Sequence, residues 1–182
     1  MAHAQFETIH PYGDGNVRIG RILIGWILTR RLGITLPPPV SVFIARDPGG
    51  YLAGMTMFRM GQLDVWVDWV AAALVHSSEA STALMAQSEA LVEMWRSRVS
   101  GIRADPTVHQ VLDLLAQHPV ITSDLISQGL GVSGRSGRAA LEVLAQHLIV
   151  EEYPRKRVGA GRPRKYWKAS ELISLATRWT AP

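Results

Sequence analysis

The chain has 182 residues, enough for one large domain or two small ones with a buried core. It contains no cysteine, which excludes disulfides, thiolate metal sites and a cysteine nucleophile. Its first ten residues lack the basic start and continuous apolar stretch of a signal peptide, and its apolar runs are too short to span a bilayer. We therefore expect a cytoplasmic protein without membrane association.

The basic residues gather at one end of the sequence. Residues 1–150 are nearly balanced in charge, whereas residues 151–182 hold eight Lys or Arg against three Asp or Glu. Such a cluster is typical of a nucleic-acid contact, because each cation near a phosphate releases a condensed counterion. A solvated basic tail is the alternative.

The first hundred residues are predicted to be all-helical. Apolar residues recur at three- and four-residue steps from Asn16 to Leu32, the pattern of an amphipathic or buried helix, and Gly33 is placed to end it. The prolines at 37–39 cannot stay helical, so they redirect the chain.

After the prolines, residues 40–46 fit either a short helix or an extended segment, and residues 47–50 predict a turn. Two further helices are expected at about 63–76 and 78–99, since Ala and Leu recur in both segments and the second also contains Met and Glu. A glycine and a proline in 101–106 make this segment the predicted boundary between two domains.

The remaining chain begins with three predicted helices. The first covers about 107–118, and the second is a short helix over 123–128 that Thr122 caps. The Gly-Leu-Gly sequence at 129–131 predicts a tight connector, and Ser133 can cap a third helix that ends near 147.

A predicted β-hairpin follows the third helix. Residues 149–153 have an extended, β-like sequence, and the basic, Gly-rich segment 155–164 would form the tip of the hairpin. Three helices, a tight turn and a hairpin with a basic tip predict a winged helix-turn-helix, whose third helix would enter the major groove. The residues expected to contact DNA are Ser133, Arg135, Ser136, Arg138, Arg155, Lys156, Arg157, Arg162 and Arg164. The alternative is a winged helix used only for protein contacts or dimerisation.

The segment from His10 to Arg21, HPYGDGNVRIGR, holds the residue types needed for nucleotide chemistry. A helix preceded by glycines offers unpaired N–H groups and the positive end of a dipole to a phosphate. Asp14 could hold Mg²⁺ beside the phosphates, and His10 can take up a proton near neutral pH. The alternative is a helix-entry turn whose arginines merely pair with carboxylates.

This segment resembles the Fic motif, HPFx(D/E)GNGRxxR, with Tyr12 in place of Phe. The preceding residues 6–9 also look like the family, and a looser resemblance continues to about Val99. The resemblance implies transfer of AMP, or occasionally another phosphate-containing group, from a nucleotide to a protein hydroxyl. It implies that His10 is the general base, that Asp14 binds Mg²⁺, and that the ATP phosphates contact Gly15, Asn16, Val17, Arg18 and Arg21.

The chain departs from the family pattern in two ways. Val17 stands where the family has Gly, and a β-branched side chain there would restrict the backbone and crowd the phosphates. Only nine residues precede His10, so we expect an N-terminally truncated Fic core without the flap that aligns the target segment.

We expect Trp66, Trp69 and Trp95 in the core, because they fall on helical apolar faces, and we find no zinc-ligand spacing among the histidines. The prediction is a mainly α protein with a partial Fic helical core in 1–100, a linker in 101–106, and a winged helix-turn-helix with a small β-hairpin in 107–182.

The predicted function is that of a Fic-type protein adenylyltransferase, which uses ATP and Mg²⁺ and modifies a hydroxyl of a target protein. A DNA-binding transcription regulator with a degenerate, non-catalytic Fic remnant is the alternative. A truncated product that folds only with a partner is a third interpretation, and a homodimer is a further expectation.

Overall fold

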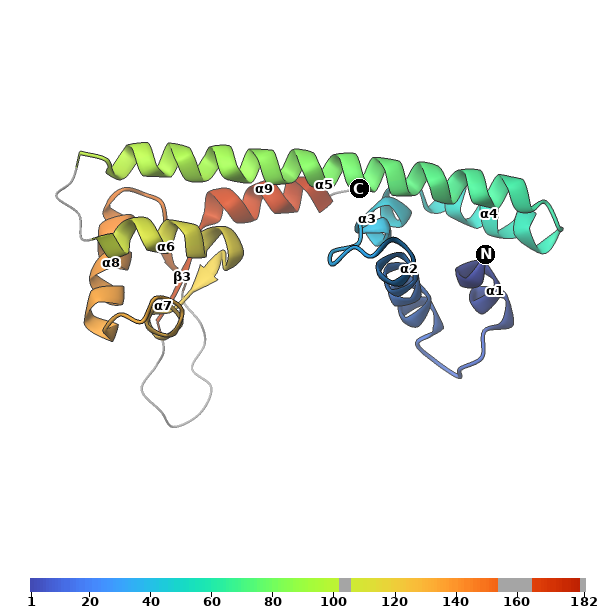
Figure 1. Ribbon diagram of the computed structural model, residues 1–182, viewed down its shortest axis with the longest axis horizontal. Coiled ribbons are helices and arrows are strands. Elements are labelled where there is room, and N and C mark those ends of the chain that lie inside the picture. Colours follow the sequence, from blue (N-terminus) through green and yellow to red (C-terminus); the bar gives the residue numbers. More distant parts are fainter. Residues whose placement is uncertain (102–105, 154–164, 181–182) are drawn as a thin grey trace. The chain divides into compact units, whose positions relative to one another are not determined.

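The computed structural model describes residues 1–101, 106–153 and 165–180. Within these residues the protein is mainly helical and has a small three-stranded antiparallel sheet (Figure 1). In chain order the elements are α1 (Ala2–Ile9), α2 (Asn16–Leu32), α3 (Val40–Arg46), α4 (Pro48–Arg59), α5 (Leu63–Val99), α6 (Pro106–Gln117), β1 (Val120–Ile121), α7 (Ser123–Leu130), α8 (Gly134–Gln146), β2 (Glu151–Tyr153), β3 (Tyr166–Lys168) and α9 (Ser170–Thr180). No helix in this described part of the chain is both long and apolar enough to cross a membrane.

Two compact units make up the structure, one containing Met1–Ala83 and the other Leu84–Trp179. The division falls within α5, and residues near the C-terminal end of that helix lie in the core of the second unit. Most of the expected linker, residues 102–105, lies outside the described residues.

In the first unit, α2 has the predicted bounds. Gly33 ends it with a φ of 65°, a conformation that favours glycine, and the Gly33 N–H donates to the Thr29 carbonyl at 3.1 Å. The ambiguous segment 40–46 is a helix, α3. The turn predicted at 47–50 is wrong, because Asp47 caps α4 by accepting a hydrogen bond from the Gly50 N–H at 2.8 Å.

The two helices predicted at 63–76 and 78–99 are one continuous helix, α5. The sequence from Leu63 to Val99 contains neither Gly nor Pro, so nothing in it breaks the backbone ladder. The hydroxyls near the expected break stay inside the helix: Ser78 donates to the Leu74 carbonyl at 2.8 Å, and Thr82 to the Ser78 carbonyl at 3.0 Å.

Aromatic residues form much of the first unit's core. Trp66 is buried and stacks on the half-buried Trp69, with ring centroids 5.6 Å apart, and Tyr51 of α4 meets both rings edge-on. The Trp69 indole N–H donates to Asp47 at 3.0 Å. The predicted core positions of these two tryptophans are confirmed.

The second unit contains the predicted helices and their caps. Thr122 accepts a hydrogen bond from the Leu125 N–H, and Ser133 accepts one from the Ser136 N–H at 3.1 Å. Gly131 ends α7 with a φ of 67°. The predicted connector at 129–131 is thus shorter, since its first two residues belong to α7.

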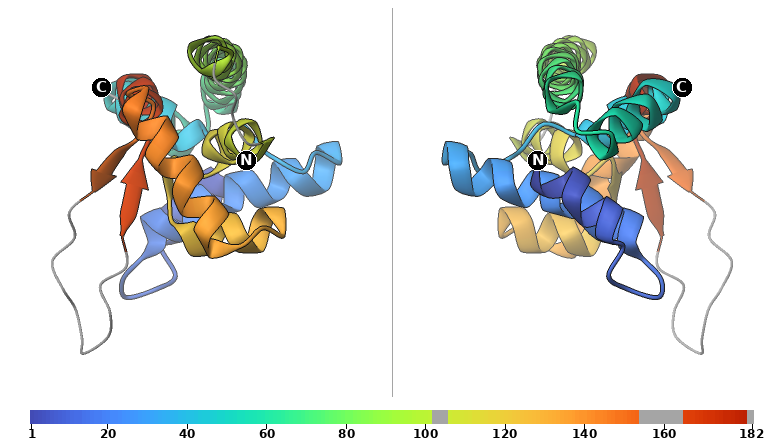
Figure 2. Two further views of the ribbon diagram at one scale, coloured as in Figure 1. Left: turned by 90° about the vertical axis from the view of Figure 1, so that its left-hand side faces the viewer. Right: turned by 90° about the vertical axis from the view of Figure 1, so that its right-hand side faces the viewer.

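The sheet of the second unit has the strand order β1-β3-β2, and both pairs of strands are antiparallel. Glu152 of β2 pairs with Trp167 of β3, and Figure 2 shows these two strands side by side. The strand β1 and the helix α9 were not predicted. The segment 154–164, where the basic hairpin tip was expected, lies outside the described residues.

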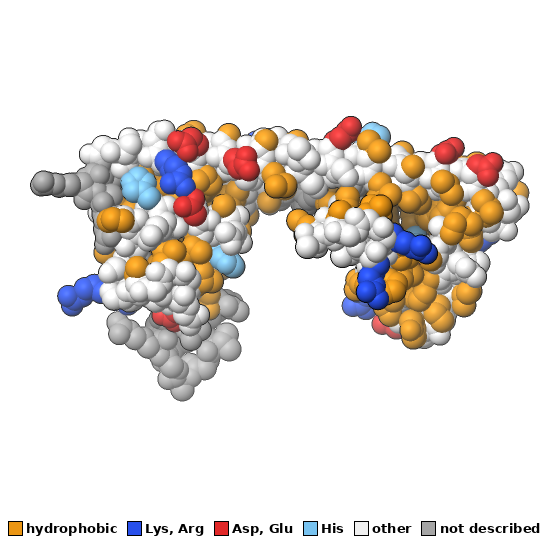
Figure 3. Space-filling model, viewed as in Figure 1, with side chains coloured by type: hydrophobic (Ala, Val, Ile, Leu, Met, Phe, Trp, Pro, Cys, Tyr) orange, Lys and Arg blue, Asp and Glu red, His pale blue; other side chains and the backbone are white. Residues whose placement is uncertain are grey.

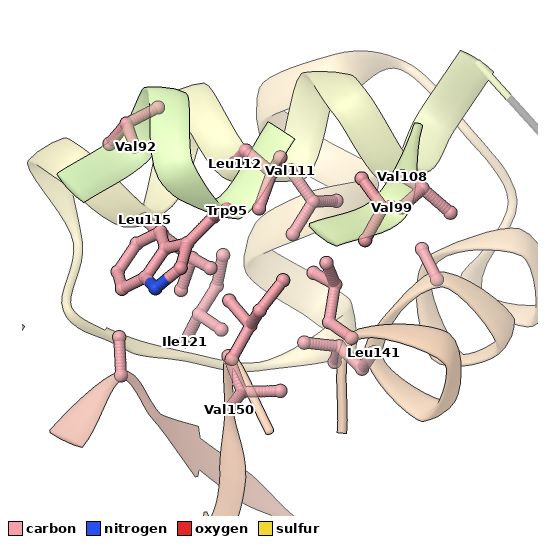
Figure 4. Packing of buried hydrophobic residues seen from close by; sticks show 14 of the residues in the cluster. Val92, Trp95, Val99, Val108, Val111, Leu112, Leu115, Ile121, Leu141 and Val150 are labelled. Atoms are coloured by element: carbon pink, nitrogen blue, oxygen red, sulfur yellow. The ribbon is translucent and has the colours of Figure 1, made fainter. Parts of the chain in front are cut away.

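The core of the second unit joins α5 to α6, α8 and the sheet (Figure 4). Trp95 of α5 is fully buried there, as predicted, and its indole N–H donates to Glu171 of α9 at 2.6 Å. Arg98 donates two hydrogen bonds to the same carboxylate, at 2.9 and 3.0 Å. This bidentate contact fixes α9 against the C-terminal end of α5.

Candidate functional site

The predicted phosphate loop connects α1 to α2. His10 ends α1 with a φ of 52°, and its N–H donates to the Phe6 carbonyl at 2.9 Å. Gly15 precedes α2 with a φ of 83°, a conformation that only glycine adopts at little cost. These two left-handed residues reverse the chain, so that α1 and α2 pack against each other.

The Asn16 side chain makes two hydrogen bonds within this loop. Its side-chain oxygen accepts from the Tyr12 N–H at 3.0 Å, and its amide nitrogen donates to the Tyr12 carbonyl at 2.6 Å. Asn16 is only 2% exposed. Because both ends of the amide already have partners, this predicted phosphate residue acts on the shape of the loop rather than pointing outward.

The N-terminus of α2 is open toward solvent. No described side chain caps its first turn, since Gly15 has none and Asp14 accepts instead from the Gly15 N–H at 2.6 Å. The backbone N–H groups that begin a helix have no partner within it. A phosphate placed here would meet these donors and the positive end of the helix dipole.

Four of the predicted catalytic, metal-binding and phosphate-binding residues lie in this loop, at its start, or in the first two turns of α2. His10, Asp14, Arg18 and Arg21 are all exposed. Arg18 pairs with Asp14 at 3.7 Å, a contact in water that contributes at most about 1 kcal/mol and leaves both groups available. Val17 lies in the first turn of α2 and is 47% exposed, so it adds an exposed apolar side chain close to the N-terminus of the helix.

Asp14 is the predicted metal ligand. Among the described residues, no group of three or more His, Asp or Glu side chains could hold a metal ion. Mg²⁺ usually keeps several waters and binds through one or two carboxylates together with substrate phosphates. A single exposed carboxylate such as Asp14 is the kind of protein ligand that Mg²⁺ takes when it arrives with a nucleotide.

A buried polar cluster that we did not predict from the sequence connects α1 and α2, the helices on either side of the loop, to α4. His3 donates from Nδ1 to the Gly20 carbonyl at 2.9 Å, and its Nε2 lies 3.1 Å from the Tyr51 hydroxyl. Burial lowers the pKa of His3 and raises the pKa of Tyr51. The neutral imidazole thus links α1, α2 and α4.

Glu7 completes this cluster and lies against the glycine at position 20. It is 9% exposed, and its Oε1 has no hydrogen-bond partner among the described residues. A side chain at Gly20 would place its Cβ 1.9 Å from that oxygen. The only available signal in the sequence was a glycine inside an otherwise strong helical pattern.

The residues predicted to contact DNA fall into two groups. Ser133 and Ser136 belong to the cap of α8, and their hydroxyls lie 3.0 Å apart. Arg135 and Arg138 are exposed on the same helix. Arg155, Lys156, Arg157, Arg162 and Arg164 lie outside the described residues.

Residues 1–28 match the family model of the Fic/DOC family. The matched segment covers α1, the loop from His10 to Gly15 and most of α2. It therefore contains the whole candidate site, together with His3, Glu7 and Gly20. A search of curated proteins finds no match to the chain.

Proposed function

We propose that the loop between α1 and α2 binds the phosphates of ATP, and that the protein is a Fic-type adenylyltransferase. The observation that carries this proposal is the match of residues 1–28 to the Fic/DOC family, because it coincides with an exposed loop ending in an uncapped helix. The reaction is the transfer of AMP from ATP to a hydroxyl of a protein target.

In this reaction the target hydroxyl attacks the α-phosphorus of ATP. A new oxygen–phosphorus bond forms, the bond between the α-phosphorus and the bridging oxygen breaks, and pyrophosphate leaves. His10 accepts the hydroxyl proton, which its exposed position at the end of α1 permits. The N–H groups of α2 and the Arg21 guanidinium stabilise the phosphate charge.

Asp14 would hold Mg²⁺ together with the phosphates, and this ion would neutralise part of their charge when bound. The Asp14 carboxylate accepts a hydrogen bond from the Gly15 N–H and lies 3.7 Å from the Arg18 guanidinium. In this proposal Arg18 exchanges the weak surface pair for a phosphate.

Transfer of AMP is tested by incubating the protein and cell extract with ATP and Mg²⁺, and by searching Ser, Thr and Tyr residues for an added AMP by mass spectrometry. We expect the modification with the wild type and its loss in His10→Ala, which removes the proton acceptor and leaves the phosphate-binding groups. Equal modification with both proteins, or none with either, would contradict catalysis and favour a non-catalytic Fic remnant.

We also propose that residues 106–180 form a winged helix-turn-helix that binds DNA. The order α6, β1, α7, α8, β2, β3 and the strand order β1-β3-β2 support this proposal. Arg135 and Arg138 are exposed near the N-terminal end of α8, where such a helix contacts the major groove.

Binding of duplex DNA is measured by fluorescence anisotropy at rising salt. We expect affinity to fall steeply with salt, and the double variant Arg135→Ala/Arg138→Ala to bind more weakly with a smaller salt slope. Arg178→Ala on α9 controls for the loss of one positive charge outside α8. Affinity that is unaffected by salt, or equal for the α8 variant and the wild type, would refute this role.

A further inference from the structure

The helix α2 presents an apolar stripe to solvent. Its inner side packs through Ile24 and Leu28 against the cluster of Val40, Ile44 and Ala73. On its outer side Ile19 is 40%, Ile22 70% and Trp26 57% exposed. These three residues recur at steps of three and four, so they lie on one side of the helix. We call them the α2 stripe.

Arginines border the α2 stripe. The helix contains four arginines and no acidic residue. Arg18 lies one turn before Ile22 and Arg30 one turn after Trp26, with the Arg30 guanidinium carbon 5.6 Å from the centre of the Trp26 ring. Figure 3 shows basic side chains beside hydrophobic ones in this part of the first unit.

We propose that the α2 stripe is the docking surface for an acidic amphipathic helix of another protein. A ridge of apolar side chains at three- and four-residue spacing fits the apolar face of a second helix. Trp and Arg are among the residues that contribute most to binding when a partner covers them. Carboxylates bordering the partner's apolar face would pair with Arg18 and Arg30 and would speed the encounter.

The charge of α2 disfavours a second copy of this chain as the occupant. In a symmetric dimer the same patch contacts itself, so a helix with four arginines would face an identical helix. Like charges placed together at an interface cost affinity. An acidic partner relieves this repulsion, whereas self-association increases it.

The probe for this interaction is a fluorescent helical peptide of about five turns, with Leu at three- and four-residue steps and Glu at the bordering positions. Two control peptides replace every Glu by Lys, or every Leu by Ser. Binding to the full chain is followed by anisotropy without nucleotide, so the result does not depend on the proposed adenylyltransferase activity. Sedimentation velocity of the protein alone reports self-association.

We expect the Glu peptide to bind and both control peptides to bind at least about tenfold more weakly. Ile22→Ser and Trp26→Ser should each weaken binding of the Glu peptide about tenfold, and Arg30→Gln severalfold with a smaller salt dependence. Val65→Ser, an exposed apolar position on α5, should leave the affinity unchanged. These exposed substitutions leave the core intact, which circular dichroism checks.

Equal affinity for the Glu and Lys peptides would overturn the proposal, as would unchanged binding in Ile22→Ser and Trp26→Ser. A dimer of the wild type that Ile22→Ser converts to monomers would also overturn it, because a second copy would then occupy the stripe.

Discussion

Val17 is the residue at which the candidate site departs from the Fic motif. Of the two expected effects of this residue, restriction of the backbone and crowding of the phosphates, the structure leaves only the second. Among the described non-glycine residues, only His10 and Leu148 have a positive φ, so Val17 occupies ordinary helical backbone that a β-branched residue can adopt. The expected restriction of the backbone is therefore absent. What remains is the bulk of an exposed side chain beside the open N-terminus of α2.

Replacing Val17 by Gly is accordingly expected to strengthen binding of MgATP severalfold, because the substitution clears the approach to the helix N–H groups. Glycine also costs helix stability, by up to about 1 kcal/mol. Val17→Ala removes both methyl groups without the loss of helix stability that glycine causes, so it serves as the control. Calorimetry measures both affinities, and unchanged binding in the two variants would show that Val17 does not limit the site.

His3 gives the first unit a predicted dependence on pH. Its pKa is lowered mainly by burial, so the unfolded chain takes up a proton more readily than the folded one. The stabilising effect of the neutral imidazole is complete above its ordinary pKa, about 6.5, and is lost as the pH falls below that value.

We therefore expect the urea midpoint of the wild type to drop between about pH 7.5 and pH 5.5. His3→Gln, which can still donate to the Gly20 carbonyl, should show a smaller drop. The midpoint is followed by circular dichroism. An equal drop in both proteins would show that another group controls the acid sensitivity.

At the level of elements, much of the structure could be predicted from local signals. Gly33, Thr122 and Ser133 mark helix ends through interactions within one turn, and the structure places them there. The helix α4 was missed because Asp47-Pro-Gly-Gly also fits a turn. The strand β1 has two residues and depends on pairing with β3, which is far away in sequence, so no local pattern predicts it.

The candidate site likewise combines features that the motif predicted with contacts that only packing creates. The motif named His10, Asp14, Arg18 and Arg21 as site residues; all four are exposed in the structure, and their roles stay predictions. The inward position of Asn16 was not predictable from spacing. The supporting contacts of His3 with Gly20 and Tyr51 join residues 17 and 48 positions apart, so they arise only from packing.

The contact of Glu171 with Arg98 and Trp95 predicts an acid-sensitive attachment of α9. The hydrogen bonds from Arg98 lower the pKa of Glu171 most, and the Trp95 indole lowers it further. Stability from this contact is present above the ordinary carboxyl pKa, about 4.3, and is lost as the pH falls through the lowered value. Glu171→Gln should therefore flatten the acid limb of stability against pH, as measured by urea unfolding. A limb as steep as that of the wild type would contradict this role.

Leu148 predicts a gain in stability. It is 82% exposed with a φ of 57°, so it stores backbone strain without burying its side chain. Leu148→Asn should raise the free energy of unfolding by about 1 kcal/mol, since Asn tolerates this conformation better. Gln146→Asn, an exposed helical position, is the control, and thermal unfolding measures both. No gain in the first variant would show that the turn is unstrained.

For the whole molecule, the division into two units separates the two proposed activities. The match to the Fic/DOC family lies entirely in the first unit, and the exposed arginines of α8 lie in the second. The proposed nucleotide chemistry and the proposed DNA binding can therefore be tested with different substitutions. In the first unit, the loop before α2 is proposed to hold ATP.

The most direct test is calorimetry of MgATP binding to the wild type, Arg21→Ala and Arg31→Ala. Arg31 is also exposed on α2 but lies in its last turn, away from the loop, so its variant controls for loss of a positive charge. We predict binding by the wild type and Arg31→Ala, and binding at least about tenfold weaker by Arg21→Ala. Binding by none of the three proteins, or equal binding by all three, would contradict a phosphate site at this loop.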